Sequence, residues 1–468
     1  MLAKDSSENG HVFAPTILRE YDIRGQIDKN LSETDAYYLG RAFGTFVRRR
    51  GGETVCVGYD GRATSPIFAE HLIKGLMECG IAVENVGLGP SPMLYFAVKD
   101  HEADAGIMIT GSHNPSDYNG FKMLLLKEGV YGALIQEIGK LAADADFENG
   151  EGSQKTSDVR EDYLARLLKD LTNQRPLKIA WDNGNGAAGD MLTRLVERLP
   201  GEHVLLYQDI DGTFPNHHPD PTVDENLVDL QRAVAEHNCD LGIAFDGDGD
   251  RIGVVDENGA VLRCDILMTI YAREVLASHP GAAIIGDVKC SQVMFDEIDK
   301  MGGNAVIWKT GHSLVKAKMA ELNAPLAGEL SGHIFFADKY YGFDDALYCA
   351  IRLINALTSE TGGLSALTKD LPKLHSTPEV RFEVDEAEKF DITPKVIESI
   401  RAQALDNTVI NDIDGLRVTS PDGWWLLRAS NTQDVLVARA EGNSAEGLER
   451  LKNIVIKEVE KIGYRLNF

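Results

Sequence analysis

The sequence predicts an α/β protein, with three similar mixed α/β domains followed by a smaller α+β domain around a central cleft. Three observations lead to this prediction. The chain has 468 residues, too many for a single hydrophobic core. Short apolar runs alternate with amphipathic segments along most of it, as in α/β layers. From residue 372 onward, apolar and polar residues alternate instead, which is typical of half-exposed strands. We place the domains at 1–157, 158–260, 261–371 and 372–468.

The first domain opens the alternation of helices and strands. Pro66 favours a helix that begins at Ser65, because proline fits the first helical turn. The apolar run 105–109 predicts a short buried strand. The expected elements are helix 34–50, strand 54–59, helix 65–79, strand 81–86, helix 91–98 and strand 105–109. Residues 146–158, rich in Gly, Glu and Ser, predict a linker.

The alternation then begins twice more. The second domain is expected to hold helix 158–171, strand 177–181, helix 190–197, strand 203–207, helix 227–237 and strand 241–245. The third is expected to hold helix 265–276, strand 282–285, helix 292–301, strand 305–308, helix 313–322 and helix 344–357. Three units of similar length suggest a structural triplication, although no sequence repeat is clear.

The last domain has a different pattern. Its expected elements are strand 379–384, helix 393–404, two strands flanking 420–423, strand 435–441 and helix 445–462. The final helix is amphipathic. Its expected core face comprises Leu448, Leu451, Ile454, Val455 and Val459.

Composition restricts the function. The formal net charge of −26 argues against a nucleic-acid partner, because phosphate backbones require a basic surface. An anionic small substrate would need clustered cations. The chain has no apolar run of the roughly 20 residues that cross a bilayer and no signal-peptide pattern at its start. We therefore expect a cytoplasmic monomer without membrane partners. Its six scattered cysteines predict buried free thiols.

The strongest feature of the first domain is the stretch 110–122, Thr-Gly-Ser-His-Asn-Pro-Ser-Asp-Tyr-Asn-Gly-Phe-Lys. It follows a predicted strand and is rich in turn-forming residues. Ser112 would be exposed at the strand end, with Lys122 near in sequence, which suits a serine that carries a phosphoryl group. The alternative is a surface loop in which Ser112 only caps a turn. A hydrolase serine with His113 as base is less favoured, because adjacent residues on an extended chain point apart.

A second motif, Asp246-Gly-Asp-Gly-Asp-Arg251, follows the predicted strand 241–245. Three carboxylates this close repel one another and need a cation to stay charged. Oxygen ligands favour Mg²⁺ over Zn²⁺. An EF-hand would need glycine where Arg251 stands and helices where strands are predicted. A solvated acidic turn is the remaining alternative.

The stretch Gly184-Asn-Gly-Ala-Ala-Gly189 matches a dinucleotide-binding pattern, G-x-G-x-x-G, between a strand and a helix. Asp182 and Asn183 would crowd acceptors against a pyrophosphate, however. A tight turn that packs a helix on a strand is the simpler interpretation.

Three further loops could bind an anionic sugar, although each could also be a structural turn. Gly328-Glu-Leu-Ser-Gly-His333 offers Glu329 and Ser331 to sugar hydroxyls and His333 as an acid or base. Lys289 and the stretch 309–313 supply cations at strand ends. Arg428, Ser430, Asn431 and Thr432, with Arg439 on the next strand, could clamp a phosphate. Loops at strand ends are where open α/β sheets bind ligands.

Taken together, the Thr-Gly-Ser-His-Asn-Pro loop, the Asp-Gly-Asp-Gly-Asp motif, the Gly-Glu-Leu-Ser-Gly-His loop and the Arg428 loop resemble those of the α-D-phosphohexomutases. The resemblance covers essentially the whole chain. The opening Arg19-Glu-Tyr-Asp-Ile-Arg-Gly25 is similar to the bacterial phosphomannomutase/phosphoglucomutase branch. The chain differs mildly from the family at Leu330, where the family often has methionine. The departure that matters is Asp434, where the family commonly has proline.

The resemblance implies an enzyme that moves a phosphoryl group between the 1- and 6-positions of mannose or glucose phosphates. The cofactors would be Mg²⁺ and a hexose 1,6-bisphosphate, which serves as intermediate and activator. Phosphorylated Ser112 and Asp246, Asp248 and Asp250 would bind the metal, and Glu329 and Ser331 would hold the sugar O3 and O4. The residues expected in catalysis are Ser112, Lys122, His333, Arg251 and Arg24. The expected substrate contacts are Tyr21, His113, Lys289, Gly311, His312, Glu329, Ser331, Arg428, Ser430, Asn431, Thr432 and Arg439.

Several points stay open from the sequence. Either Lys122 or His333 could handle the hydroxyl proton. A phosphatase would share Ser112 and the metal, and a non-catalytic sensor would share the fold. Asp434 could weaken the phosphate clamp. Closure of the last domain over the substrate would exclude water, so we expect a hinge near 368–375.

Overall fold

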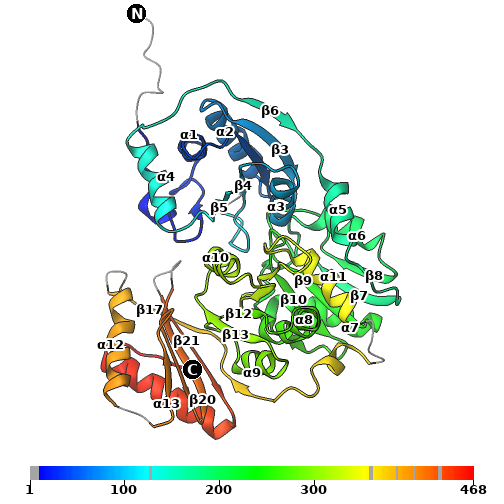
Figure 1. The fold of residues 1–468 in the computed structure, drawn as a ribbon, viewed down its shortest axis with the longest axis vertical. Coiled ribbons are helices and arrows are strands. Elements are labelled where there is room, and N and C mark those ends of the chain that lie inside the picture. The colour runs from blue at the N-terminus through cyan, green and yellow to red at the C-terminus, as the bar shows by residue number, and fades with distance from the viewer. Residues whose placement is uncertain (1–9, 126–128, 358–361, 386–387, 404–405, 431–434) are drawn as a thin grey trace, which may run out of the picture.

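The computed structural model describes residues 10–125, 129–357, 362–385, 388–403, 406–430 and 435–468. It contains four sheets, each with its own helices, which we call domains I to IV in chain order. Domain I lies at the top of Figure 1, domains II and III lie below it, and domain IV packs against domain III. No helix in these residues is long and apolar enough to cross a membrane.

Domain I is a six-stranded mixed sheet in the order β1-β5-β4-β2-β3-β6. Its strands are β1 (Ile23–Gln26), β2 (Thr54–Tyr59), β3 (Ala82–Leu88), β4 (Ala105–Ile109), β5 (Tyr118–Leu125) and β6 (Ser153–Thr156). Its helices are α1 (Glu33–Arg49), α2 (Ser65–Met77), α3 (Ser91–Asp100) and α4 (Ala133–Ala143). Alternate residues of β2 face opposite cores: Val55 and Val57 contact the core of α1, α2 and α4, while Cys56 joins the core of α3.

Domain II has a five-stranded sheet in the order β11-β10-β9-β7-β8. Its elements are α5 (Arg160–Leu168), β7 (Leu177–Asp182), α6 (Gly189–Val196), β8 (Gly201–Leu206), α7 (Val228–His237), β9 (Leu241–Phe245), β10 (Ile252–Asp256) and β11 (Val261–Leu262). Strands β8, β7 and β9 run parallel, and β10 returns antiparallel to β9. The turn between β9 and β10 carries the three aspartates.

Domain III has a four-stranded sheet in the order β13-β12-β14-β15. Its elements are α8 (Cys264–Ser278), β12 (Ala283–Asp287), α9 (Gln292–Lys300), β13 (Asn304–Trp308), α10 (His312–Leu322), β14 (Leu326–Gly328), β15 (Ile334–Phe336) and α11 (Ala346–Ala356). One hydrophobic core runs without a break from α3 of domain I through domain II into α8 and α11. Domains I to III therefore pack as one body.

Domain IV is an antiparallel sheet, β16-β21-β20-β19-β18, with β17 also paired to β21. Its elements are β16 (His375–Ser376), β17 (Val380–Glu383), α12 (Lys389–Ala402), β18 (Val409–Asn411), β19 (Leu416–Ser420), β20 (Gly423–Ala429), β21 (Val435–Gly442) and α13 (Ala445–Lys461). It has its own core, which includes Leu451, Val455 and Val459 of α13. Among the described residues, a small separate apolar cluster joins it to domain III: Val288, Trp424 and Leu426, with the partly buried Ile307 and Ile413 packed against them.

One difference from the expected elements affects the site. Residues 118–122, interpreted above as part of a loop, begin β5, which pairs antiparallel with both β4 and β1. The sequence Tyr-Asn-Gly hides this strand, because Asn and Gly are usual in turns. Lys122 is therefore fixed on a central strand, opposite Met108.

Candidate active site

Ser112 lies in the loop between β4 and β5 in an unusual backbone conformation. Its φ is +49°, in the left-handed region that non-glycine residues rarely adopt. Its Oγ donates to Asp246 Oδ2 at 2.9 Å and lies 3.1 Å from His113 Nδ1. Only 1% of its surface is exposed, so the expectation of an exposed serine is wrong. The loop thus presents the serine hydroxyl directly to the aspartates of domain II.

Arg62, a residue that the sequence analysis missed, fixes this loop. It is fully buried, and its Nε donates to Asp60 Oδ2 at 3.1 Å. Its other nitrogens donate to four carbonyl oxygens of the loop, those of Ser112 (2.8 Å), Asn114 (2.7 Å), Pro115 (2.6 Å) and Tyr118 (2.9 Å). Its place after β2, at the same sheet edge as Ser112, was the signal that could have identified it.

The three aspartates of domain II converge as the sequence predicted. Asp246, Asp248 and Asp250 are buried, and each offers an oxygen within 4.8 Å of the others. Among the described residues, Asp248 Oδ1 has no hydrogen-bond partner, and Asp250 Oδ1 has only His333 Nε2 at 3.3 Å. Burial and repulsion from Asp250 and Asp248 raise the pKa of Asp246 well above its usual value. An unpartnered oxygen and mutual repulsion fit a hard divalent cation.

Lys122 supplies a positive charge from domain I. Its Nζ lies 2.6 Å from Asp248 Oδ2 and 2.5 Å from Asp250 Oδ2. Burial disfavours the ammonium form, but Asp248 and Asp250 outweigh it and raise the pKa of Lys122 well above its usual value. The ammonium group therefore occupies the side of the aspartate cluster that faces domain I.

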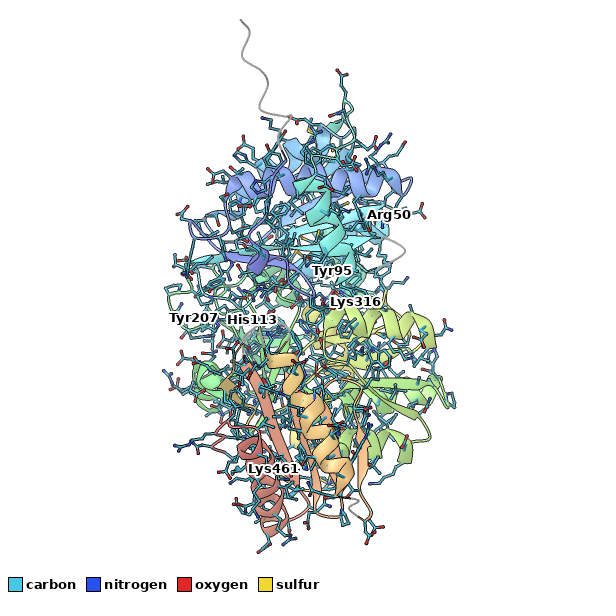
Figure 2. The ribbon with its side chains drawn as sticks, turned by 90° about the vertical axis from the view of Figure 1, so that its left-hand side faces the viewer. Arg50, Tyr95, His113, Tyr207, Lys316 and Lys461 are labelled. Carbon is cyan, nitrogen blue, oxygen red and sulfur yellow. The ribbon has the colours of Figure 1, made fainter. Side chains whose placement is uncertain are left out.

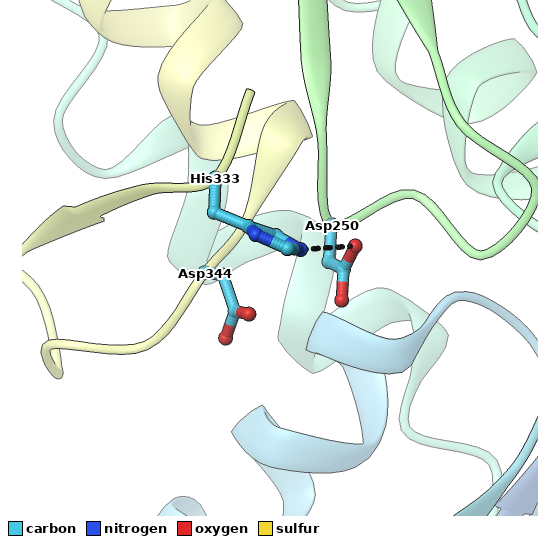
Figure 3. A group of neighbouring side chains, drawn as sticks. All are labelled: Asp250, His333 and Asp344. Atoms are coloured by element: carbon cyan, nitrogen blue, oxygen red, sulfur yellow. Dashed lines mark ion pairs between the residues drawn. The ribbon is translucent and has the colours of Figure 1, made fainter. Parts of the chain in front are cut away.

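A backbone bridge joins the aspartate loop to the loop 328–333 of domain III. Arg251 and His333 pair as antiparallel residues, and Ile252 N donates to Gly332 O at 3.1 Å. His333 Nε2 lies 3.3 Å from Asp250 Oδ1 (Figure 3). Its Nδ1 lies 2.9 Å from Glu329 Oε2. Burial opposes the charge on His333, but Asp250 raises its pKa to about 9. The site holds His333 between two carboxylates.

Asp344 lies beside His333 and is fully buried (Figure 3). Its Oδ1 accepts from Lys316 Nζ at 3.0 Å, and its Oδ2 lies 3.8 Å from His312 Nδ1. Asp250, His333 and Asp344 together have the composition of a metal site. Lys316 already neutralises Asp344, however, and Arg251 Nε lies 3.2 Å from His333 Nε2. We therefore place the cation site at the three aspartates.

Contacts between domains I and III include those of Lys316 with Tyr95 and of Thr310 with Tyr21. Lys316 Nζ lies 5.0 Å from the ring centre of Tyr95 (Figure 2). Tyr21 donates to Thr310 O at 2.8 Å, and a Cβ on Gly311 would lie 2.6 Å from the Tyr21 ring. Gly311 also has a φ of +131°, so glycine is required there for two reasons.

Arg24 lies against the serine loop. It donates to the side chains of Asn114 and Asp22, and its buried Nε has no partner among the described residues. His113, next to Ser112, is held neutral, because burial and the nearby charge of Arg251 lower its pKa well below the usual value. His312 is also neutral, because burial and Lys316 lower its pKa.

The predicted phosphate clamp is spread over the border between domains III and IV. Arg428 and Arg439 lie on adjacent strands, β20 and β21, and on the same face of the sheet. Arg428 is ion-paired with Asp414, while Arg439 Nη1 donates to Lys289 O at 2.5 Å. Asn431, Thr432 and Asp434 lie outside the described residues, and Ser430 lies at the edge of them.

Two carboxylates accompany Lys289 at this border. Its Nζ lies 3.6 Å from Glu379 Oε2 and 3.8 Å from Asp287 Oδ2. Burial opposes ionisation of Glu379, but Lys289 and Arg381 lower its pKa to about 2. Lys289 is thus held charged at the face that domain III turns to domain IV.

The glycine loop at 184–189 packs beneath the aspartate loop. Ala187 N donates to Gly247 O at 2.8 Å, and a Cβ on Gly186 would lie 3.0 Å from the carbonyl oxygens of Asp246 and Gly247. The loop allows a close backbone approach between the two segments. Gly186 thus serves the packing of this loop against the aspartate loop, whereas the sequence analysis expected a turn that packs a helix on a strand.

Comparison with known proteins decides the family. Models of the four phosphoglucomutase/phosphomannomutase domains match in order: α/β/α domain I at residues 15–148, α/β/α domain II at 161–259, α/β/α domain III at 263–375 and the C-terminal domain at 379–458. The chain belongs to the phosphoglucomutase/phosphomannomutase family. The family resemblance, the fold class and the mutase class predicted from the sequence are confirmed.

Relatives within this family match over nearly their whole length. The chain is 43% identical to a phosphomannomutase/phosphoglucomutase of Pseudomonas aeruginosa, over 96% of this chain and 97% of that protein. It is 41% identical to a phosphoglucomutase of Neisseria meningitidis, over 94% and 96% of the two chains. A crystal structure of a family member from Burkholderia thailandensis has 43% identity and a TM-score of 0.92, covering 98% of this chain and 100% of that chain.

Proposed function

We propose that this enzyme interconverts the 1- and 6-phosphates of mannose and glucose through phosphorylated Ser112 and a hexose 1,6-bisphosphate. One observation carries the proposal: Ser112 Oγ lies 2.9 Å from Asp246, at the edge of a buried group of three aspartates. A serine in this position can carry a phosphoryl group beside a bound cation. The family match and the relatives that act on mannose and glucose phosphates support the choice of substrates.

Asp246, Asp248 and Asp250 would hold Mg²⁺, together with an oxygen of phosphorylated Ser112. The buried Asp248 Oδ1, which has no partner among the described residues, and the convergence of the three carboxylates fit this assignment. When bound, the ion would neutralise charge on the transferred phosphoryl group. Arg24, with its buried unpartnered Nε near the serine loop, would stabilise the same oxygens. Arg251 would act through its contact with His333.

In the transfer step, the free hydroxyl oxygen of the sugar phosphate forms a new bond to phosphorus, and the bond from phosphorus to Ser112 Oγ breaks. The hydroxyl proton passes to a base of the enzyme, and Ser112 Oγ takes up a proton as it leaves, which restores the serine hydroxyl. Lys122 and His333 are the two candidates for the base. Both are held as cations here, so either must first lose its proton before it can accept the hydroxyl proton.

His333 is linked to Glu329, which we expect to hold the sugar hydroxyls O3 and O4 with Ser331. A proton acceptor in the same loop as the sugar contacts would keep its position relative to the reacting hydroxyl. Lys122 is instead fixed on β5 beside the aspartates. This arrangement favours His333 as the base and Lys122 as a stabiliser of phosphoryl charge.

Arg428, Ser430, Asn431, Thr432 and Arg439 would bind the phosphate that does not react. Tyr21, Lys289, Gly311, His312 and His113 would contact the bisphosphate while it turns over. A site that reads O3 and O4 need not read C2, where glucose and mannose differ, so we expect activity on both. A cytoplasmic location and a monomeric state remain predictions from the sequence.

Phosphorus NMR would test the proposal. The protein is incubated with Mg²⁺, a trace of glucose 1,6-bisphosphate and either mannose 1-phosphate or glucose 1-phosphate. Appearance of the 6-phosphate without inorganic phosphate supports a mutase, and comparable rates support dual specificity. Release of inorganic phosphate alone would show a phosphatase instead. A strong preference for glucose phosphates would contradict the dual specificity.

A further inference from the structure

Thr310, between β13 and α10, connects three domains through one residue. Its carbonyl oxygen accepts from Tyr21 of domain I at 2.8 Å, and its Oγ1 donates to Asp287 of domain III at 3.0 Å. Its backbone N–H donates to Asp414 Oδ2 of domain IV at 2.9 Å. The following residue, Gly311, donates its N–H to Glu329. The backbone here links the expected sugar contact Glu329 to domain IV.

Asp414 binds a second partner within its own domain. Arg428 Nη2 lies 3.1 Å from Asp414 Oδ2 and 3.3 Å from Asp414 Oδ1. Both side chains are largely buried, with 14% and 7% of their surfaces exposed. Arg428 Nε is buried without a partner among the described residues. One carboxylate thus fixes one end of the guanidinium group and leaves another donor for a ligand.

We propose that Asp414 is a positioning residue that couples the docking of domain IV on the Thr310 loop to the orientation of Arg428. The inference rests on the proposed role of Arg428 in binding the phosphate that does not react. A charge-assisted hydrogen bond holds a long arginine side chain in one rotamer. The side chain then loses less conformational entropy when phosphate binds. Asp414 also accepts from Thr310 N. The Arg428 side chain is therefore held in its orientation most strongly when domain IV is docked on the Thr310 loop.

Docking itself does not depend on Asp414 alone. Arg417 of domain IV donates to the carbonyls of Val288 and Cys290 at 2.7 Å each. Glu441 accepts from Ser291 Oγ at 2.8 Å and from Gln292 N at 3.1 Å. These contacts predict that a variant at Asp414 keeps the fold and the border between domains III and IV. Its effect can then be measured on ligand binding.

A double-mutant cycle with Asp414→Asn and Arg428→Met would test the coupling. Asparagine can still accept from Thr310 N, but it loses the charge that holds Arg428. We expect D414N to weaken binding of glucose 1-phosphate about tenfold, and to have less than about a twofold effect when Arg428 is already methionine. Asp422→Asn, which removes a charge from an exposed pair with Arg450 in the same domain, is the matched control.

Binding would be measured by calorimetry on dephosphorylated full-length protein, so that no turnover is needed. Full additivity of D414N and R428M would overturn the proposal and leave Asp414 as a docking residue only. No effect of R428M on binding would also overturn it, by removing Arg428 from the clamp. The NMR assay above reports separately on mutase activity, so a failure of the proposed function would be recognised as such.

Discussion

The ammonium group of Lys122 lies 2.5 Å from a carboxylate oxygen of Asp250, although the two residues belong to different domains. Asp248 completes the contact at 2.6 Å. A cation from domain I therefore offsets the negative charge of the aspartates that lie together in domain II. This contact predicts that Lys122 and a divalent ion stabilise the same carboxylates.

Lys122→Met should destabilise the protein by about 3–5 kcal/mol, because two buried carboxylates lose their partner. Added Mg²⁺ should raise the melting temperature of this variant more than that of the unchanged protein. Thermal denaturation with and without Mg²⁺ measures both effects. Lys300→Met, at an exposed lysine paired with Glu297, is the control and should behave as the unchanged protein. Equal Mg²⁺ shifts in both variants would contradict the shared role.

Ser112→Ala should lower turnover by more than about a thousandfold, because the acceptor of the phosphoryl group is lost. The fold should survive, since the methyl group fits the same space. The matched control is Ser116→Ala, an exposed serine four residues further along the same loop. Mass spectrometry should find a phosphoryl group on the unchanged protein and on S116A after incubation with glucose 1,6-bisphosphate. Phosphorylation of S112A would assign the transfer to another residue.

Arg62→Lys should reduce kcat about a hundredfold, because a small displacement of a reacting group is enough for a loss of that size. Lysine cannot reproduce the fork that binds four loop carbonyls and Asp60. KM should change little, because Arg62 binds the backbone of the serine loop and is not itself expected to contact the substrate. Arg49→Lys, at an ion pair with Asp146 on the surface of domain I, is the control. A rise in KM at constant kcat would argue that Arg62 acts on binding instead.

The pKa of Glu379, lowered to about 2, predicts a pH dependence of stability. A carboxyl group with a lowered pKa stabilises the folded protein above its unfolded pKa near 4.5 and loses that contribution as the pH falls towards 2. At neutral pH the contribution is at most about 3 kcal/mol. Denaturant unfolding should therefore show E379Q to be less stable than the unchanged protein at pH 7. The difference should shrink steadily below pH 4.5, and a constant difference would contradict the ion pair with Lys289.

The hinge expected near 368–375 remains a prediction. Domain IV has its own core and meets domain III mainly through Trp424, Leu426 and a set of hydrogen bonds. Few apolar contacts would have to break if domain IV moved. Small-angle scattering should show compaction when the bisphosphate is added. An unchanged radius of gyration would count against a hinge.

The sequence predicted the architecture because hydrophobic periodicity is local. The run 241–245 and the aspartates that follow it predicted both β9 and the carboxylate group. Hydrophobic periodicity could not reveal the role of Arg62, because the loop carbonyl oxygens that it binds are about fifty residues away in the chain. Strand β5 was missed because Asn119 and Gly120 are typical turn residues, and only pairing with β4 and β1 makes them a strand. Asp414 likewise has no local signal, since Thr310 comes from another domain.

The burial of Ser112 restricts how this serine could first be phosphorylated. The residue is 1% exposed, in a left-handed conformation, and its loop is tied down by Arg62. Protein kinases read an extended segment, which this loop cannot offer while the domain is folded. If Ser112 carries the transferred group, as we propose, its first phosphoryl group would arrive on a small molecule that reaches the aspartate side of the loop. A cell that makes this chain without such a donor would hold a folded but idle enzyme, and its activity would follow the supply of the sugar bisphosphate.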